Sequence, residues 1–245
     1  MRWDVHSLTD KGERELNEDS IELIQEDNFL CALLCDGLGG HEGGELASQC
    51  VCASVKDTLS SCDKTLPLRE IIENAVEKAQ EALLNEQIER NKTGAMKTTL
   101  CCLIFRGEEA AAAWVGDSRI YQFRAGRLLG HTPDHSIPQY LVNAGEITES
   151  QIRRHPDRNK LLRVMGSHWD TPRYQFWELE QPQPGDAFLL CSDGLWDWID
   201  ERHMTRKLRF SRSSEGWLLS MVNTVLRNGR GKGMDNYSAI AIRIR

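Results

Sequence analysis

Acidic residues follow apolar runs at several places in this 245-residue sequence, and their carboxylates are the groups best suited to chemistry. The run Phe29–Leu34 leads through a cysteine to Asp36, and the run Asp186–Cys191 leads through a serine to Asp193; in both cases a glycine follows the aspartate. Asp235 stands just before a third strand-like run. Carboxylates beside open backbone carbonyls are ligands of hard cations such as Mg²⁺ or Mn²⁺.

Two further acids, Glu18 and Asp19, lie in the segment Arg14–Ser20 ahead of the first buried run. If these five acids meet in the fold, they repel one another and raise one another's pKa values unless divalent cations neutralise them. Two such cations can activate a water and orient a phosphoryl group for in-line attack. Taken alone, however, the early segment also fits a surface loop, and the glycine-rich stretch after Asp36 fits a flexible turn.

The elements around these acids follow from hydrophobic periodicity. Phe29–Leu34 is predicted to be a buried strand, and an apolar residue every fourth position predicts an amphipathic helix from Gly44 to about Ser61. A second helix begins near Pro67 and extends to at least Leu83, and a third begins at about Glu215. Alternation over residues 239–244 predicts a closing strand.

The middle of the chain is predicted to form three strands, at 98–105, 110–115 and 119–124, which pair as antiparallel neighbours. Gly116-Asp117-Ser118 joins the last two, and these residue types alone favour an ordinary hairpin turn. His131, Asp134 and His135 follow, but Pro133 breaks the helix that would place both histidines on one face. Zinc is therefore disfavoured.

Residues 137–171 look like an insertion. Thr148-Glu149-Ser150-Gln151 matches a helix capping box, and Pro156 ends that helix. The segment carries most of its charge on basic residues, which fits either a solvated surface or a flap that meets an anionic substrate.

Composition limits the possible functions. The net charge of −7 disfavours a nucleic-acid partner and a polybasic membrane anchor. No apolar run reaches the roughly 20 residues that span a bilayer, and the first residues lack a signal-peptide pattern. We therefore expect a cytoplasmic protein whose eight cysteines are mostly buried, reduced thiols.

Six motifs follow one another along the chain: Arg14-x-x-Asn17-Glu18-Asp19, Asp36-Gly37-x-Gly39-Gly40-His41, Gly116-Asp117-Ser118-Arg119, Thr132-x-Asp134-His135-Ser136, Ser192-Asp193-Gly194-Leu195-Trp196-Asp197 and Asp235-Asn236. Their order resembles that of the type 2C, metal-dependent protein serine/threonine phosphatases, most closely the compact bacterial members. The resemblance extends from Arg14 to Ile244.

The resemblance implies an α+β fold, a four-layer α-β-β-α sandwich of two antiparallel sheets flanked by helices. It makes residues 1–245 a single catalytic domain with a flap insertion at about 137–171. It also implies two Mn²⁺ or Mg²⁺ ions, and a third at Asp117 and Asp193. The implied ligands are Glu18, Asp36, the Gly37 carbonyl, Asp193 and Asp235, with Arg14 binding the substrate phosphate and Asp19 and Asn236 supporting the site.

By the same resemblance the reaction is hydrolysis of phosphoserine or phosphothreonine monoesters by in-line attack of a metal-bridging hydroxide, with Arg14, Asp36 and Asp193 catalytic. The implied substrate is a phosphorylated protein, opposing a eukaryotic-like Ser/Thr kinase in bacterial signalling, and we expect a monomer. Eukaryotic members carry a histidine two residues after the bridging aspartate, whereas this chain has Leu38. A catalytically silent binding module and a hydrolase of small phosphoesters are the alternatives.

Overall fold

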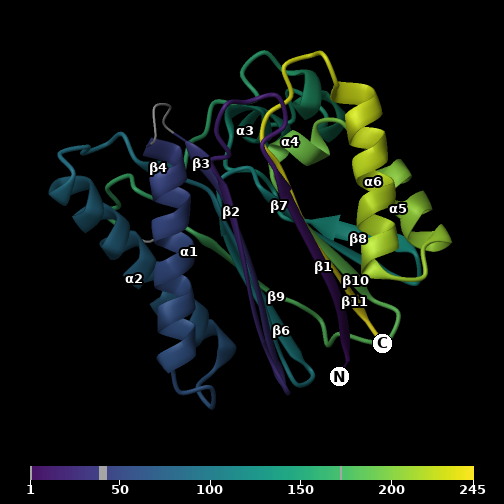
Figure 1. Ribbon diagram of the computed structural model, residues 1–245, viewed down its shortest axis with the longest axis horizontal. Helices are drawn as coiled ribbons and strands as arrows, with labels where there is room; N and C mark the ends of the chain where they lie inside the picture. The colour runs from purple at the N-terminus through teal and green to yellow at the C-terminus, as the bar shows by residue number, and fades with distance from the viewer. Residues whose placement is uncertain (1, 39–42, 172) are drawn as a thin grey trace.

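The computed structural model describes residues 2–38, 43–171 and 173–245; Gly39, Gly40, His41 and Glu42 of the predicted glycine-rich motif lie outside them. Two antiparallel sheets stack against each other, with α1 and α2 outside one sheet and α5 and α6 outside the other (Figure 1). This is the predicted four-layer sandwich.

The first sheet has the strand order β2-β3-β5-β6-β9, with short β4 paired to β3. Its strands are β2 Asp19–Glu26, β3 Phe29–Leu38, β4 Lys97–Thr98, β5 Leu100–Arg106, β6 Glu109–Val115 and β9 Gln175–Glu178. The second sheet has the order β1-β11-β10-β7-β8. Its strands are β1 Trp3–Asp10, β7 Arg119–Arg124, β8 Arg127–His131, β10 Ala187–Cys191 and β11 Tyr237–Ile244.

Apolar side chains fill the space between the sheets. Leu30, Ala32 and Leu34 of β3 belong to the same buried cluster as Ile240 and Ile242 of β11. The rings of Phe105 and Phe188, one from each sheet, pack edge to face with centroids 5.0 Å apart, a favourable geometry for an aromatic pair. Burial on both faces explains why β3 is a continuous apolar run rather than an alternating one.

The helices cover the outer faces through the periodic stripes found in the sequence. Helix α1, Gly43–Ser61, and helix α2, Leu68–Glu89, bury theirs against the first sheet. Helices α5, Glu201–Phe210, and α6, Ser214–Gly229, cover the second. Among the described helices, none has the length and apolar character needed to cross a membrane.

The predicted pairing of 110–115 with 119–124 is wrong. Strand β6 pairs with β5 and β9, whereas β7 pairs with β10 and β8 in the other sheet. Residues 116–118 therefore cross between sheets. Gly116 has a φ of 102° and exchanges hydrogen bonds with His135: its N–H donates to Nδ1 (3.1 Å), and its carbonyl accepts from the backbone N–H (2.8 Å). Asp117 is thus not a hairpin-turn residue.

Other boundaries also differ from the predictions. The predicted strand 98–105 is divided at Thr99 into β4 and β5, and β3 continues past Asp36 because Gly37 and Leu38 pair with β4. Helix α6, predicted to begin at about Glu215, begins at Ser214. Strands β1 and β2 and helix α5 were not predicted.

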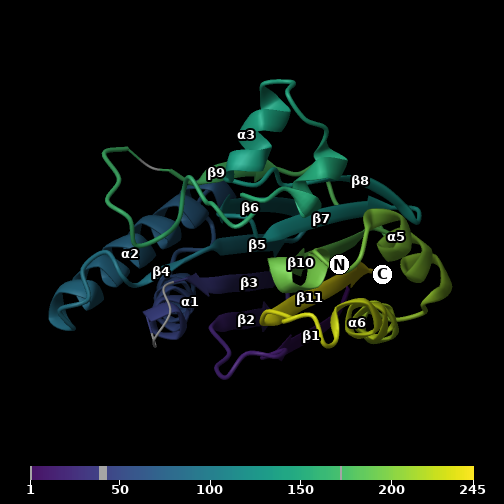
Figure 2. The ribbon, with the colours of Figure 1, turned by 90° about the horizontal axis from the view of Figure 1, so that it is seen from above.

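Residues 137–171, the predicted insertion, project from the sandwich (Figure 2), near the end of the sheets that carries α4, Asp193–Trp196 (Figure 1). It contains α3, Ile137–Asn143, and a 3₁₀ helix, η1, Glu149–Arg154. The capping box of Thr148 and Gln151 is present as predicted. Its last part returns to the first sheet, where Met165 forms a β-bridge with Thr98.

Candidate active site

The predicted acids are carried by strand ends of both sheets. Asp36 lies near the end of β3, and Asp19, at the start of β2, is its register partner. Asp193 opens α4 directly after β10, and Asp235 precedes β11. In Figure 1 the end of β3, α4 and the start of β11 lie at the same upper edge of the sandwich. The structure therefore brings these acids to one edge between the sheets.

Two glycines let the backbones approach closely there. A Cβ on Gly37 would lie 2.6 Å from the Glu18 carbonyl oxygen and 2.3 Å from that of Gly44. A Cβ on Gly194 would lie 2.0 Å from the Asn236 carbonyl oxygen. Any side chain at either position would force these segments apart. Gly37 thus lets Asp36 lie against the segment that carries Glu18, and Gly194 lets Asp193 lie against the segment that carries Asp235.

Asn236 holds the loop between β1 and β2 in place. Its Oδ1 accepts the backbone N–H of Glu18 at 2.7 Å, and its Nδ2 donates to the carbonyls of Lys11 (2.9 Å) and Leu16 (2.8 Å). Its amide oxygen and nitrogen are thus both used within the protein, where they hold this loop.

Asp36 and Asp193 are partly buried and lie among other acids. Desolvation raises the pKa of the Asp36 carboxyl well above its usual range, and the charges of Asp19 and Asp193 add to the rise. Desolvation likewise raises the pKa of Asp193 well above the usual range, with further contributions from Asp117 and Asp197. These couplings place the acids within electrostatic reach of one another.

The pKa values of three further acids are also raised. Burial raises the pKa of Asp19 to about 6, although Ser192 Oγ donates a 2.9 Å hydrogen bond to its Oδ2. Burial and the charge of Asp134 raise the pKa of Asp117 to about 7. The pKa of Glu18 is raised by desolvation and by Asp235. We call Glu18, Asp19, Asp36, Asp117, Asp193 and Asp235 the acidic group.

Arg14 supplies a positive charge next to this group. Its guanidinium donates to Asp235 Oδ2 at 2.7 Å, and both side chains are about half exposed. The sequence predicted that Arg14 faces a phosphate. In the structure its partner is Asp235, which the sequence predicted to be a metal ligand.

The acidic group suits hard divalent cations by the type of its donor atoms, although its side chains are not arranged as a complete coordination site. Within residues 2–38, 43–171 and 173–245, no group of three or more His, Cys, Asp or Glu side chains has an arrangement that could hold a metal ion as it stands. However, every donor is a carboxylate oxygen, as Mg²⁺ and Mn²⁺ prefer. Oδ1 of Asp19 is buried without a hydrogen-bond partner, as is Oδ1 of Asp197. Positive charge at this edge would satisfy such oxygens.

The histidines that could have indicated zinc have other partners. His131 Nε2 lies 2.7 Å from Glu149, and His135 Nε2 lies 3.1 Å from Gln175 Oε1. Asp134 accepts two hydrogen bonds of 2.8 Å from Arg119. The structure therefore gives no support to a zinc site at these three residues.

Glu13 was missed by sequence reasoning. Its carboxylate accepts the backbone N–H groups of Gly231 (2.5 Å), Gly233 (2.8 Å) and Met234 (3.1 Å), and these bonds lower its pKa. It thereby fastens the segment just before Asp235 to the loop that carries Arg14. Because all three partners lie more than 200 residues away, no local pattern in the sequence indicates this contact.

Comparison with known proteins agrees with this geometry. A family model described as protein phosphatase 2C matches residues 11–230. A serine/threonine phosphatase, Stp, of Listeria monocytogenes is 32% identical over 211 residues, covering 84% of this chain and 82% of that protein. The phosphatase PstP of Mycobacterium tuberculosis is 31% identical over 230 residues, or 93% of this chain, but the match spans only 42% of PstP.

Among solved structures, the catalytic domain of the serine/threonine phosphatase PstP in complex with two manganese ions superposes with a TM-score of 0.81 at 27% identity, covering 99% of both chains. The resemblance inferred from the sequence motifs and the fold expected from it are both confirmed. The chain belongs to the protein phosphatase 2C family.

Proposed function

We propose that this protein is a divalent-cation-dependent phosphatase that hydrolyses phosphoserine and phosphothreonine monoesters in proteins. The observation that carries the proposal is the acidic group, in which carboxyls from both sheets meet at one edge of the fold, and desolvation and their mutual repulsion raise the pKa values of Glu18, Asp36 and Asp193. Its relatives are named serine/threonine phosphatases, and one of them is solved with two manganese ions.

In this proposal Glu18, Asp36, Asp193, Asp235 and the Gly37 carbonyl would hold two Mn²⁺ or Mg²⁺ ions, and Asp117 with Asp193 would hold a third. The bound ions would lower the pKa of a water nucleophile and stabilise the charge on the transferring phosphoryl group. The chain's own contribution is to fix the donors, through the glycine contacts and the hydrogen bonds of Asn236.

Arg14 would bind the phosphate of the substrate. A guanidinium matches the geometry of phosphate oxygens through two parallel hydrogen bonds. Its present bond to Asp235 involves two half-exposed side chains, and such exposed pairs contribute little, about 0–1 kcal/mol. Exchanging the Asp235 carboxylate for a substrate phosphate therefore costs little free energy, and the Arg14 side chain can change partner when substrate binds.

A small-molecule substrate is the second candidate. Three basic residues of the flap are already paired: Arg153 with Glu201, Arg158 with Asp197, and Lys160 with Asp157. The flap therefore offers less free positive charge to an anionic protein than the sequence suggested. This observation weakens one argument for a protein substrate. An opposing kinase, a monomeric state and a cytoplasmic location stay predictions.

Turnover of a phosphothreonine peptide, compared with para-nitrophenyl phosphate, tests the proposal. We expect the metal-stripped protein to be inactive, Mn²⁺ to restore activity, and kcat/KM to favour the peptide. Asp36→Asn is the matched control, because it removes one charge at nearly constant volume. Activity in excess chelator contradicts the metal dependence, and preference for the small ester contradicts the protein substrate.

A further inference from the structure

Trp196 lies between the flap and the acidic group and contacts residues of both. It is the last residue of α4, three positions after Asp193, and only 2% of its surface is exposed. Its indole Nε1 donates to the backbone carbonyl of Asp117 at 3.0 Å. One side chain thus joins the helical turn that begins with Asp193 to the segment that carries Asp117.

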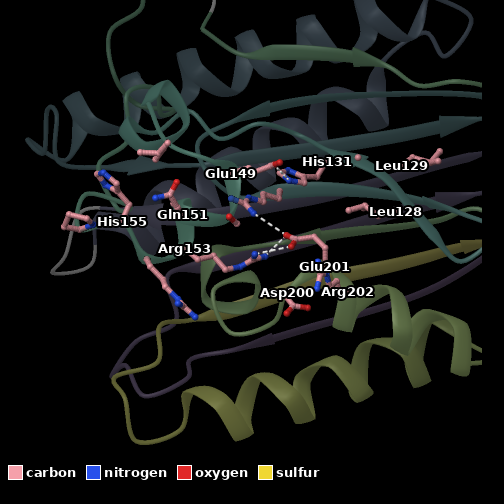
Figure 3. Close-up of a pocket in the computed structure, with 16 residues that line it drawn as sticks. Leu128, Leu129, His131, Glu149, Gln151, Arg153, His155, Asp200, Glu201 and Arg202 are labelled. Carbon is pink, nitrogen blue, oxygen red and sulfur yellow. Dashed lines mark hydrogen bonds and ion pairs between the residues drawn. The ribbon is translucent and has the colours of Figure 1, made fainter. Parts of the chain in front are cut away.

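Arg153 of the flap holds Trp196 from the other side. Its Nε donates to the Trp196 carbonyl at 2.9 Å, and its guanidinium carbon lies 5.7 Å from the indole centroid. Two further hydrogen bonds, of 3.1 and 2.5 Å, join it to the Glu201 carboxylate of α5. Figure 3 shows these two side chains pointing toward each other, and both line a cavity of about 1330 Å³.

The remaining contacts fix both partners. Arg119 packs on the indole with its guanidinium carbon 3.7 Å from the ring centroid, and its Nε and Nη2 bind Asp134. Ile152, next to Arg153, is 1% exposed and belongs to the same buried cluster as Trp196. A buried arginine stacked on tryptophan is a strong and well-oriented contact. The contact of Arg153 with Trp196 therefore attaches the flap to α4, the helical turn that begins with Asp193, beside the Arg158–Asp197 ion pair.

We propose that Arg153, acting through Trp196, is a positioning residue that couples the docking of the flap to the placement of Asp117. When η1 is docked, the indole N–H holds the Asp117 carbonyl, and the carboxylate is kept beside Asp193. When η1 moves away, Trp196 loses its backbone bond from Arg153 and the Asp117 segment loses a fixed neighbour. This inference rests on the proposed function only in assigning a cation to Asp117.

The first test needs neither metal nor turnover. The indole N–H cross-peak of Trp196, identified by its loss in Trp196→Phe, is followed by ¹⁵N NMR in the metal-free protein. We expect Arg153→Ala to shift this peak and to speed tryptic cleavage within residues 137–171. Arg154→Ala, which removes the adjacent exposed guanidinium, is the matched control and should change neither. An unshifted Trp196 peak in Arg153→Ala overturns the coupling.

The second test measures cation binding by calorimetric titration with Mn²⁺. Losing one oriented hydrogen bond costs about 1 kcal/mol, so the weakest Mn²⁺ site should bind roughly five- to tenfold less tightly in Arg153→Ala and in Trp196→Phe. Arg153→Lys should recover only part, because an ammonium lacks the planar fork. In an Asp117→Asn background, Arg153→Ala should have no added effect on this site.

The outcomes separate the two proposals. If Asp117→Asn titrates like the wild type, the cation role of Asp117 fails, and with it the functional consequence of the coupling. If Asp117→Asn loses a site while both Arg153 variants titrate like the wild type, the proposed function stands and the coupling through Trp196 is wrong. Equal, additive losses in the double variant would also contradict the coupling.

Discussion

Two neighbouring groups of charged side chains in this protein differ in how their charge is compensated. Desolvation and the charges of neighbouring acids raise the pKa values of five members of the acidic group, Glu18, Asp19, Asp36, Asp117 and Asp193. The second set, Arg119, Asp134, Arg153 and Glu201, which we call the paired group, is joined by ion pairs of 2.5 to 2.8 Å. In it the pKa of Glu201 is lowered and that of Arg119 is raised well above its usual range, so each partner stabilises the other's charge.

The difference separates a structural role from a chemical one. The paired group is already neutralised by its own side chains, and removing one partner would leave a buried charge uncompensated. The acidic group gathers negative charge whose only nearby cation in the described ion pairs is the half-exposed Arg14. A protein keeps such a set only where something binds to it, because the repulsion costs stability.

The largest expected effect comes from removing a central acid. Asp36→Ala or Asp193→Ala should lower kcat/KM by roughly 10³-fold or more, equivalent to about 4 kcal/mol of transition-state stabilisation. The metal-free variants should unfold at the same temperature as the wild type or higher, since each loses a repelling charge. Phosphopeptide turnover and thermal unfolding together check this. Near-normal rates in either variant would remove that residue from the site.

The paired group should respond in the opposite way. Asp134→Asn leaves Arg119 buried without its counter-charge and should destabilise the protein by about 3–5 kcal/mol. Urea unfolding in chelator measures this. The exposed pair Arg69 and Glu73 on α2 offers a matched control, and Glu73→Gln should cost well under 1 kcal/mol. Equal effects at the two pairs would contradict the distinction.

The pH dependence of stability sharpens the comparison. Asp19 and Asp117 have folded pKa values of about 6 and about 7, above the ordinary value of 3.8. Between pH 4 and 7 the folded state therefore binds more protons than the unfolded state, and the free energy of unfolding falls as the pH rises. In chelator, the melting temperature should drop from pH 5 to pH 7.5. Asp117→Asn should flatten this slope, and an unchanged slope would contradict the assignment.

Arg14 is expected to give the smallest effect. Arg14→Ala should raise KM more than it lowers kcat if its contact with phosphate is equally strong in the ground state and the transition state. Arg14→Lys should recover only part of the affinity. Steady-state kinetics with a phosphothreonine peptide separate the two constants. Wild-type kinetics in both variants would show that Arg14 does not bind the phosphate and is only a residue of a surface loop.

Much of this arrangement was predictable because it depends on local patterns. Buried runs identified β3 and β10, and helical stripes identified α1, α2 and α6. Helix α5 was missed because only Met204 and Leu208 of its ten residues are buried, which is too sparse for a periodic signal. The crossover at Asp117 was predicted to be a hairpin turn because glycine, aspartate and serine favour such a turn as readily as they fit a crossover between sheets. Only the bonds between Gly116 and His135 distinguish the two.

The sequence indicated candidate site residues but not the contacts that connect them. The acids stand beside the apolar runs, either where a run ends, as at Asp36 and Asp193, or ahead of one, as at Asp235. A single sequence reveals this, and the order of the motifs indicated the family. The clamp of Glu13, the pairing of Arg14 with Asp235 and the attachment of Arg153 to Trp196 join residues more than 40 positions apart. Such contacts depend on how the two sheets stack, and no local residue pattern records that.

The most direct test of the central claim is the unfolding temperature of the metal-stripped protein at pH 7.5 as Mn²⁺ is added. A ligand that binds only the folded state stabilises it by an amount that grows with the logarithm of its concentration, about 2.7 kcal/mol at one hundred times its Kd. The wild type should therefore gain several degrees with each large step in Mn²⁺ concentration, whereas Asp36→Asn should gain little. A wild-type melting temperature that does not respond to Mn²⁺ would contradict the account.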